Sequence, residues 1–414
     1  MTKSTLNHDR EIRMTEFDVI SELSLRSPSK IVLLVMDGLG GLPRPETGLT
    51  ELATALKPNL NALARESMTG LSIPILPGIT AGSGPAHLAL FGYDPIACNV
   101  GRGVLSALGI GFPLGPTDLA ARINFATVDA EGRVTDRRAG RISTEKNREL
   151  VGLLREIKIP GVEIFLETES MHRAVLVFRG PNLSARLTDT DPQHTGVAPH
   201  PVTVHEPSAQ PSADLMNRFV GEAARILAGH HPANFVLLRG FATYPHLPQF
   251  TDVYKLRPAA VATYPMYRGL GRLVGMDVLA TGETFADEVK TVAENWDRYD
   301  YFFLHFKYSD TTGEDGDFDA KVRAIEEVDR SLPDLLALKP DVICVTGDHS
   351  TPSVLRQHSW NPVPFMLRGA YDIADDVDQF TEKACQKGTL GRFPAQQVML
   401  MLMGSALKLE KFGA

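Results

Sequence analysis

The chain of 414 residues has a formal net charge of −8, with 43% hydrophobic and 22% charged residues. This composition is typical of a globular protein long enough for two domains, and it argues against a membrane span and against binding to nucleic acid or anionic lipid. The three cysteines, Cys98, Cys344 and Cys385, form no CxxC pair, which argues against a disulfide framework or a thiolate zinc site. We therefore expect a reducing, cytoplasmic compartment.

The first 28 residues are polar and lack the apolar stretch of a secretory signal. We predict that residues 1–28 form a polar extension. It would contain one amphipathic helix, with Ile12, Phe17, Ile20 and Leu23 on its apolar face.

Strand and helix patterns alternate along the two ends of the chain. Residues 31–36 form a continuous apolar run, which is typical of a strand buried on both faces. Residues 58–68 carry apolar side chains at helical spacing, beginning with a proline that suits a first helical turn. Further strands are predicted at residues 235–238, 301–305 and 341–345, and a further helix at residues 320–332, which stops at Pro333. This alternation predicts an α/β architecture with a mostly parallel sheet flanked by helices.

The middle of the chain has a different pattern. Between residues 111 and 255 the strands are shorter, as at residues 174–178, and the loops are long and rich in proline, serine and histidine. We interpret residues 111–255 as a smaller α+β domain, inserted into the first as a substrate-binding domain or lid. The core domain would then comprise residues 29–110 and 256–414.

Polar side chains follow several of the apolar runs, and parallel strands would bring them to one edge of the sheet. They are Asp37; Ser83 and His87; His305, Asp310 and Glu314; and Asp348, His349 and His358. Structural alternatives exist for these residues: Asp37 could begin a turn, and Ser83 could cap the helix that follows it. Asp310 and Glu314 could form a solvated acidic face, and either His87 or His305 could be a packed structural residue.

One kind of chemistry would use all of these groups together. Asp, Glu and His side chains are ligands for zinc and manganese. A serine at the start of a helix lies beside free backbone N–H groups and the positive end of the helix dipole, where a phosphoryl group can bind. A divalent metal would let the serine hydroxyl ionise near neutral pH, and two metals can hold both oxygens of an in-line phosphoryl transfer.

Several motifs occur in order along the chain: LLVMDGLG at 33–40, AHLALFGYDP at 86–95, GRGV at 101–104, DRRAGR at 136–141, DTDP at 189–192, DGD at 315–317, TGDHSTP at 346–352 and KFGA at 411–414. Together they resemble the archaeal-type cofactor-independent phosphoglycerate mutases, of the alkaline phosphatase superfamily, over nearly all of residues 30–414. The resemblance implies an alkaline-phosphatase-like core. It also implies interconversion of 3-phosphoglycerate and 2-phosphoglycerate through a phosphoserine, without added 2,3-bisphosphoglycerate.

The resemblance further implies that Ser83 is the nucleophile and that two divalent metal ions are bound. One ion would be held by Asp37, Ser83, Asp348 and His349, and the other by Asp310, Glu314 and His358. The expected metal is Mn²⁺, with Mg²⁺, Co²⁺ or Zn²⁺ as alternatives.

Two positions depart from the family pattern. The family commonly has an acidic residue directly after the serine, where this chain has Gly84, and it has histidine where this chain has Glu314. Glutamate also binds hard cations, so a metal site with a different charge and metal preference is expected. The alternative function is a metal-dependent phosphatase or phosphotransferase acting on another small phosphorylated metabolite. A non-catalytic binding protein is a third hypothesis. The metal-capable side chains at all of the implied ligand positions argue against it.

The implied substrate carries a phosphate and a carboxylate, which arginine recognises through bidentate contacts. The candidates for substrate binding are His87, Arg102, Arg137, Arg138, Arg141, Asp191, His194 and Arg268. Each arginine could instead be a surface charge, and the Asp191 and His194 pair could be a structural turn.

Overall fold

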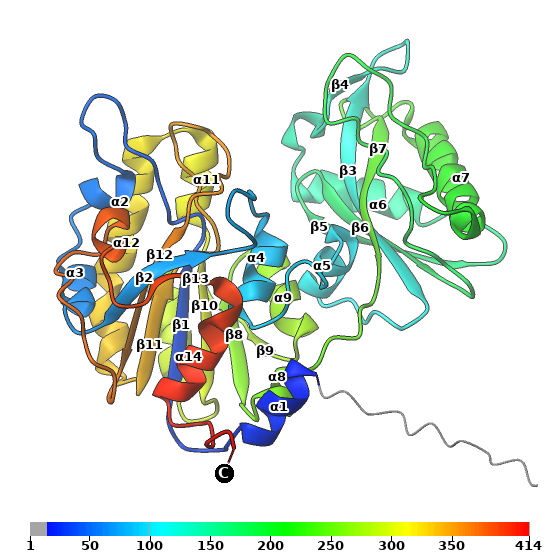
Figure 1. Cartoon of the computed structure of the whole chain (residues 1–414). Coiled ribbons are helices and arrows are strands. Elements are labelled where there is room, and N and C mark those ends of the chain that lie inside the picture. The colour runs from blue at the N-terminus through cyan, green and yellow to red at the C-terminus, as the bar shows by residue number, and fades with distance from the viewer. Residues whose placement is uncertain (1–14, 99, 414) are drawn as a thin grey trace, which may run out of the picture.

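The structure, a computed structural model, describes residues 15–98 and 100–413, which form two lobes, each built around its own β-sheet (Figure 1). The strands of the larger sheet are β1 (Ile31–Met36), β2 (Met68–Ile73), β8 (Pro258–Ala262), β9 (Asp277–Leu279), β10 (Tyr301–Phe306), β11 (Val342–Thr346), β12 (Val363–Gly369) and β13 (Gly391–Pro394). They lie in the order β13-β2-β12-β11-β1-β10-β8-β9. β12 runs antiparallel to β2 and β11, while the other neighbours are parallel, which confirms the prediction of a mostly parallel sheet.

β1 lies inside the larger sheet, between β10 and β11. All of its side chains are buried, and they alternate between two hydrophobic clusters. Leu33 and Val35 pack in the cluster on one face, while Leu34 and Met36 pack in the cluster on the other. A strand covered on both faces needs apolar side chains at every position, which explains the continuous apolar run at residues 31–36.

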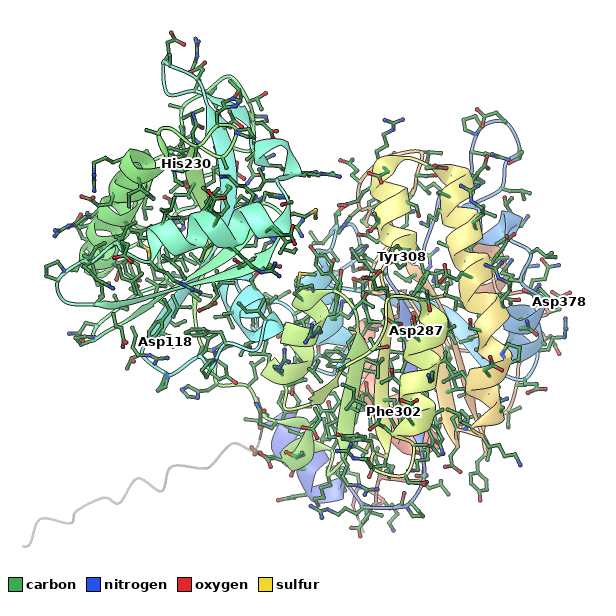
Figure 2. The ribbon with its side chains drawn as sticks, turned by 180° about the vertical axis from the view of Figure 1, so that it is seen from behind. Asp118, His230, Asp287, Phe302, Tyr308 and Asp378 are labelled. Atoms are coloured by element: carbon green, nitrogen blue, oxygen red, sulfur yellow. The ribbon has the colours of Figure 1, made fainter. Side chains whose placement is uncertain are left out.

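Helices cover both faces of this sheet. The face with Leu33 is covered by α1 (Glu16–Leu23), α4 (Ser83–Leu90), α5 (Arg102–Gly109), α8 (Phe250–Val253), α9 (Pro265–Leu273) and α14 (Val398–Ser405). The face with Leu34 is covered by α2 (Glu51–Thr54), α3 (Pro58–Ala64), α10 (Phe285–Glu294), α12 (Phe318–Ala337) and α13 (Glu382–Cys385). α11 (Tyr308–Asp315) follows β10 and packs against α12. Figure 2 shows the larger lobe from behind, with Phe302 of β10 inside it and Tyr308 at the start of α11.

The smaller lobe contains an antiparallel sheet. Its strands are β3 (Asp118–Val128), β4 (Val134–Asp136), β5 (Glu163–Ser170), β6 (Arg173–Arg179) and β7 (Phe235–Thr243). Leu119, Ile123 and Phe125 of β3 pack on one face, which is covered by α6 (Thr144–Leu154) and α7 (Gln210–Leu227). Ala120 and Val175 point to the opposite face and join the core of the larger lobe. Short 3₁₀ helices occur at Ala139–Arg141, Pro207–Ala209 and Ala395–Gln397.

α5 packs against α9 of the larger lobe and against β3 and β7 of the smaller one. Glycines allow this close packing. A Cβ on Gly103 would lie 2.4 Å from the carbonyl oxygen of Ala120, and one on Gly109 would lie 2.1 Å from that of Pro265. A Cβ on Gly269 of α9 would lie 2.1 Å from the carbonyl oxygen of Leu105. At these three glycines the backbones therefore lie too close together to admit a side chain.

The structure differs from the sequence predictions mainly at the ends of elements. The N-terminal helix is confirmed as α1, with Ile20 buried, but the predicted Ile12 lies outside the described residues. α3 ends at Ala64, before residue 68, because the chain continues into β2. The segment predicted to end the inserted domain at residue 255 includes α8, whose Phe250 packs in the core of the larger lobe.

α12 continues through Pro333, where the helix was predicted to stop. Proline has no N–H and leaves the carbonyl four residues earlier without its helical donor. That carbonyl belongs to Asp329, and the side-chain amide of Asn59 donates to it at 3.0 Å. Asn59, far away in the sequence, thus supplies the hydrogen bond that Pro333 cannot donate to the carbonyl of Asp329. Across the described part of the chain, no helix is long and apolar enough to cross a membrane.

Candidate functional site

Three neighbouring parallel strands deliver polar side chains to one edge of the larger sheet. β1 leads to Asp37, β11 leads to Asp348 and His349, and β10 leads through Lys307 into α11, which carries Asp310. Because β11, β1 and β10 are adjacent and parallel, their carboxyl ends lie side by side. The predicted grouping of these residues at one edge agrees with the structure.

The first group of possible metal ligands consists of Asp37, Asp348 and His349, all buried, with ligand atoms within 4.8 Å of one another. Nε2 of His349 lies 3.4 Å from Oδ1 of Asp37 and 3.2 Å from Oδ2 of Asp348. Neither of these carboxylate oxygens has a hydrogen-bond partner within the described ranges. Buried oxygens without donors are costly, so this set of atoms fits a divalent cation.

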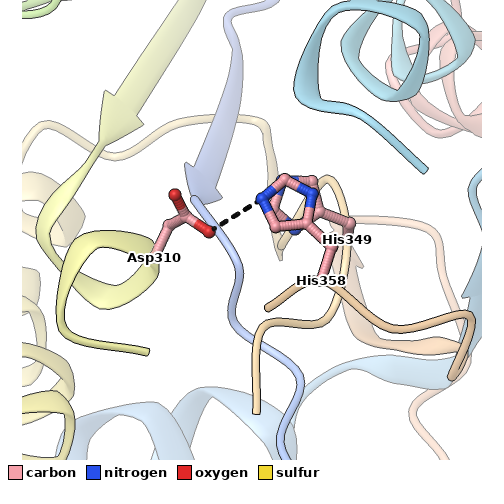
Figure 3. Close-up of side chains that lie close together, drawn as sticks. All are labelled: Asp310, His349 and His358. Carbon is pink, nitrogen blue, oxygen red and sulfur yellow. Dashed lines mark ion pairs between the residues drawn. The ribbon is translucent and has the colours of Figure 1, made fainter. Parts of the chain in front are cut away.

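The second group consists of Asp310, His349 and His358 (Figure 3). Nε2 of His358 lies 3.5 Å from Oδ1 of Asp310, and the rings of His358 and His349 stack with centroids 3.7 Å apart. Nδ1 of His358 bonds to the carbonyl of Ala81 at 2.9 Å. A carbonyl can only accept, so Nδ1 carries a proton, and in the neutral ring Nε2 has a lone pair that can bind a metal.

Glu314 lies at the edge of the second group, although it was predicted as a ligand. Its side chain is 56% exposed, and Oε1 lies 3.6 Å from Nε2 of His358. The interaction with His358 lowers the pKa of Glu314. Burial disfavours the charged form of His358, but the interactions with Glu314 and with the charge of Asp310 outweigh it and raise the pKa of His358 to about 9. The second group thus shares His349 with the first group, and Glu314 stays a predicted ligand at its edge.

Ser83 is the first residue of α4, with Gly82 as the N-cap. The serine side chain makes no capping bond; instead Oγ lies 3.0 Å from Nε2 of His349. The alternative in which Ser83 only caps a helix is therefore wrong. A Cβ at the following Gly84 would lie 3.3 Å from Cδ1 of Leu105, so the acidic residue common in the family would press against an apolar side chain here.

Lys307, Tyr267 and Thr351 were not predicted from the sequence, but all three bond to the carboxylates. Lys307 donates from Nζ to Oδ2 of Asp37 at 2.8 Å and to Oδ2 of Asp310 at 2.5 Å. Tyr267 donates to the same oxygen of Asp37, and Thr351 donates to Oδ1 of Asp310 at 2.6 Å. Burial raises the pKa of Asp37, but Lys307, His305 and His349 together outweigh it and hold that pKa well below its usual range.

His87 and His305 are completely buried among these groups. Nδ1 of His87 lies 2.8 Å from the carbonyl of Ser83 and 3.2 Å from Oδ2 of Asp348. These contacts position Asp348, and the substrate contact of His87 stays a prediction. His305 stacks on Tyr267 with ring centroids 3.4 Å apart, and neither ring nitrogen has a hydrogen-bond partner within residues 15–98 and 100–413.

A group of arginines, Arg122, Arg173 and Arg239, lies on the face of the smaller sheet that is turned toward α5. Arg122 of β3 stands directly opposite Arg239 of β7. Directly opposed like charges destabilise a sheet, and Nε of each of the three arginines lacks a partner in the described chain. Burial and the neighbouring arginines lower the pKa of Arg122 to about 10. This arginine group fits a bound anion, which would offset the repulsion.

Of the other predicted substrate residues, Arg137 and Asp191 bond to each other beside the arginine group. Arg137 forms a bidentate pair with the buried Asp191, with both bonds at 2.7 Å, and Arg239 lies 3.4 Å from the same carboxylate. Asp191 therefore connects a predicted arginine to the arginine group. The remaining candidates are the exposed Arg102, Arg138, Arg141 and His194, and the half-buried Arg268 of α9.

Tyr264, at the start of α9, lies between the arginine group and the carboxylates. Arg173 donates to its hydroxyl. Cζ of Arg173 lies 5.7 Å from the centroid of the Tyr264 ring, and Nζ of Lys307 lies 5.8 Å from it. The ring of Tyr264 therefore lies near one cation of the arginine group and near the cation beside the carboxylates.

Comparisons with known proteins give a consistent result. A family model described as 2,3-bisphosphoglycerate-independent phosphoglycerate mutase matches residues 64–234. A probable 2,3-bisphosphoglycerate-independent phosphoglycerate mutase of Thermotoga neapolitana is 50% identical over 400 residues, 95% of this chain and 98% of that protein. The protein of the same description from Deinococcus radiodurans is 50% identical, over 96% of this chain and 99% of that protein.

Two solved structures resemble the whole chain. The PH0037 protein of Pyrococcus horikoshii has a TM-score of 0.81 and 32% identity, with 94% of this chain and 100% of that chain covered. The cofactor-independent phosphoglycerate mutase of Thermoplasma acidophilum has a TM-score of 0.68 and 32% identity, with 91% of this chain and 100% of that chain covered. Both lobes are therefore part of the similarity.

Proposed function

This chain belongs to the 2,3-bisphosphoglycerate-independent phosphoglycerate mutases, and from this premise we propose that Ser83 carries the phosphoryl group between the 3- and 2-hydroxyls of glycerate. The observation that carries the proposal is the position of Ser83. Its Oγ is free of capping bonds and lies 3.0 Å from His349, beside both ligand groups. The start of α4 also directs free N–H groups toward a phosphoryl group on the serine.

The reaction would proceed by two displacements of opposite direction. Oγ of Ser83 attacks phosphorus, the bond from phosphorus to the 3-oxygen of glycerate breaks, and the serine proton is transferred to that oxygen. Glycerate then turns within the site, its 2-hydroxyl attacks the phosphoserine, the bond from phosphorus to Oγ breaks, and the hydroxyl proton returns to Oγ of Ser83. No phosphate is gained or lost, so added 2,3-bisphosphoglycerate is not required.

Two divalent cations fit the ligand groups, with Mn²⁺ as the first candidate and Mg²⁺, Co²⁺ or Zn²⁺ as alternatives. Asp37, Asp348 and His349, with Ser83, would hold one ion, and Asp310 and His358, with Glu314 at the outer side, would hold the other. When bound, the ions supply Lewis acidity that favours the serine alkoxide. The unpaired buried oxygens of Asp37 and Asp348 support this proposal.

The arginine group would bind the carboxylate end of the substrate. Arg122, Arg173 and Arg239 face the larger lobe, and Tyr264 separates them from Lys307. Asp191 holds Arg137 and Arg239 in fixed orientations. This arrangement would keep the glycerate in the site while its phosphate is on Ser83, which an isomerase requires and a phosphatase does not.

The smaller lobe, predicted at residues 111–255, would act as a lid in this reaction. Water that reaches the phosphoserine would hydrolyse it, so closure of the smaller lobe over the larger would protect the intermediate. The site residues lie in both lobes, as closure requires. A reducing cytoplasmic location suits the free thiols of Cys98, Cys344 and Cys385.

An enolase-coupled assay with 3-phosphoglycerate, Mn²⁺ and no added 2,3-bisphosphoglycerate tests the proposal. Ser83→Ala should lower turnover by at least roughly a thousandfold, because the nucleophile is lost. It should also abolish the phosphoserine trapped by rapid quench with labelled substrate. Ser208→Ala, at an exposed position of the smaller lobe, is the matched control and should behave as wild type.

Two outcomes would contradict the proposal. Substantial turnover by Ser83→Ala would exclude the covalent route through this serine. Release of free phosphate by the wild type faster than isomerisation would favour the phosphatase alternative, which the departures at Gly84 and Glu314 suggest.

A further inference from the structure

Lys307 directly follows β10 and lies at the centre of the site, with 18% of its side chain exposed. Its ammonium group contacts Oδ2 of Asp37 at 2.8 Å, Oδ2 of Asp310 at 2.5 Å and the hydroxyl of Tyr267 at 3.2 Å. An ammonium has three protons, and these three contacts can use all of them. Lys307 is thus a fixed cation that joins one carboxylate from each ligand group.

Lys307 bonds to one oxygen of each carboxylate and leaves the other oxygen to the ligand groups. Oδ1 of Asp37 lies 3.4 Å from Nε2 of His349, and Oδ1 of Asp310 lies 3.5 Å from Nε2 of His358. In each carboxylate, Oδ1 thus faces an imidazole nitrogen and Oδ2 bonds to Lys307. The ammonium group therefore lies beside both ligand groups.

The orientation of the two carboxylates does not depend on Lys307 alone. Oδ2 of Asp37 also accepts from Tyr267, and Oδ1 of Asp310 accepts from Thr351 at 2.6 Å. Each carboxylate would keep a donor if the lysine were neutral. The contribution that these other bonds cannot replace is the positive charge of Lys307.

We propose that Lys307 is a charge-balancing positioning residue that lets this carboxylate-rich site accept a dianionic phosphoryl group. The proposal rests on the proposed function. The carboxylates of Asp37, Asp310, Asp348 and Glu314 would balance the charge of two divalent ions. Lys307 then supplies the excess positive charge that attracts phosphate. The same charge repels the metal ions, so phosphate affinity is gained at the expense of metal affinity.

Lys307→Met, which keeps the side-chain length and removes the charge, should change two affinities in opposite directions. In calorimetric titrations of the metal-free protein, Mn²⁺ should bind about tenfold more tightly than to wild type. At saturating Mn²⁺, inorganic phosphate should bind at least about tenfold more weakly. In the mutase assay, KM for 3-phosphoglycerate should rise in parallel with the phosphate dissociation constant.

Three further variants complete the experiment. Lys307→Arg keeps the charge and should restore phosphate binding to within a few-fold of wild type. Lys307→Gln should reproduce the effects of Lys307→Met, which guards against a folding defect of one variant. Lys290→Met removes a charge from the exposed side of α10, where its side chain is 73% exposed, and should change neither affinity.

Weaker Mn²⁺ binding by both Lys307→Met and Lys307→Gln would show that the lysine only orients the ligands, and would overturn the proposal. Unchanged phosphate affinity in these variants would overturn it as well. A wild-type protein that binds none of Mn²⁺, Mg²⁺, Co²⁺ and Zn²⁺, or does not isomerise 3-phosphoglycerate, would refute the proposed function and this inference with it. Measurement of the wild type first therefore distinguishes the two failures.

Discussion

Glu314 places a carboxylate at the outer side of the second ligand group, 3.6 Å from Nε2 of His358. A carboxylate favours hard cations such as Mn²⁺ or Mg²⁺, whereas an imidazole nitrogen suits Zn²⁺ better. The partly exposed position means that this side chain can change without disturbing the buried ligands. Metal preference at this site should therefore depend on the residue at position 314.

Glu314→His should raise the affinity for Zn²⁺ relative to Mn²⁺, by roughly tenfold, and should leave measurable mutase activity. Calorimetric titrations with each metal, together with the mutase rate, provide the measurement. Asp315→Asn removes a neighbouring exposed carboxylate and is the control for charge alone. An identical Zn²⁺ to Mn²⁺ ratio in wild type and Glu314→His would exclude Glu314 from the metal site.

The residues directly after strands were the predictable part of the site. Asp37, Asp348 and His349 follow apolar runs, and a strand delivers the next residue to the edge of its sheet. Arg122 and Arg239 were not predictable, because they face each other only in the particular register of β3 and β7. A slip of one residue would turn either side chain to the opposite face, and no local pattern specifies that register.

At the scale of elements, α12 supports the loops that carry the ligands. Its Lys321 is completely buried and donates to the carbonyls of Gly38 at 2.8 Å, Gly40 at 3.1 Å and Thr351 at 2.8 Å. Gly38 follows Asp37, and Thr351 lies two residues after His349. One lysine therefore holds the loop after β1 against the loop after β11.

Lys321→Met should lower the free energy of unfolding by about 2–4 kcal/mol, because three buried carbonyls lose a charged donor. Urea unfolding of the metal-free protein, followed by circular dichroism, measures the change. Lys290→Met, on the exposed surface of α10, should change it by less than about 0.5 kcal/mol. Equal stability of the two variants would show that the loops are held by other contacts.

Element types were predictable where a pattern is local, and element ends were not. The apolar runs identified β1, β10 and β11, whose side chains need no distant partner to be recognised as buried. The end of α12 depended on Asn59, which compensates for Pro333 through a contact between segments far apart in the sequence. A local sequence pattern does not predict such a contact.

At the scale of the whole molecule, the packing of α5 fixes how the two lobes are connected. Gly269 of α9 lies against the backbone of α5, where a Cβ would lie 2.1 Å from the carbonyl oxygen of Leu105. A backbone atom cannot move aside as a flexible side chain can. The contact between α5 and α9 should therefore tolerate no added atom.

Gly269→Ala should lower the free energy of unfolding by roughly 1–3 kcal/mol, because the helices must separate to admit the methyl group. The matched control is Gly221→Ala in α7, where a Cβ meets nothing within 4 Å. That control should raise the free energy of unfolding by about 0.5–1 kcal/mol, since alanine favours a helix over glycine. Thermal and urea unfolding measure both, and stabilisation by Gly269→Ala would contradict the packing described here.

The central place of β1 has a consequence for synthesis of the chain on the ribosome. β1 is made long before its partners β10 and β11, and the nearer of them ends at Phe306. At an elongation rate of about 5–20 residues per second, roughly 15–60 s pass between the synthesis of β1 and the completion of β10, its first partner. During that interval a fully apolar strand with two open edges is exposed, the kind of segment that aggregates or is bound by a chaperone. Nascent-chain pull-downs should therefore find residues 31–36 engaged until β10 has emerged.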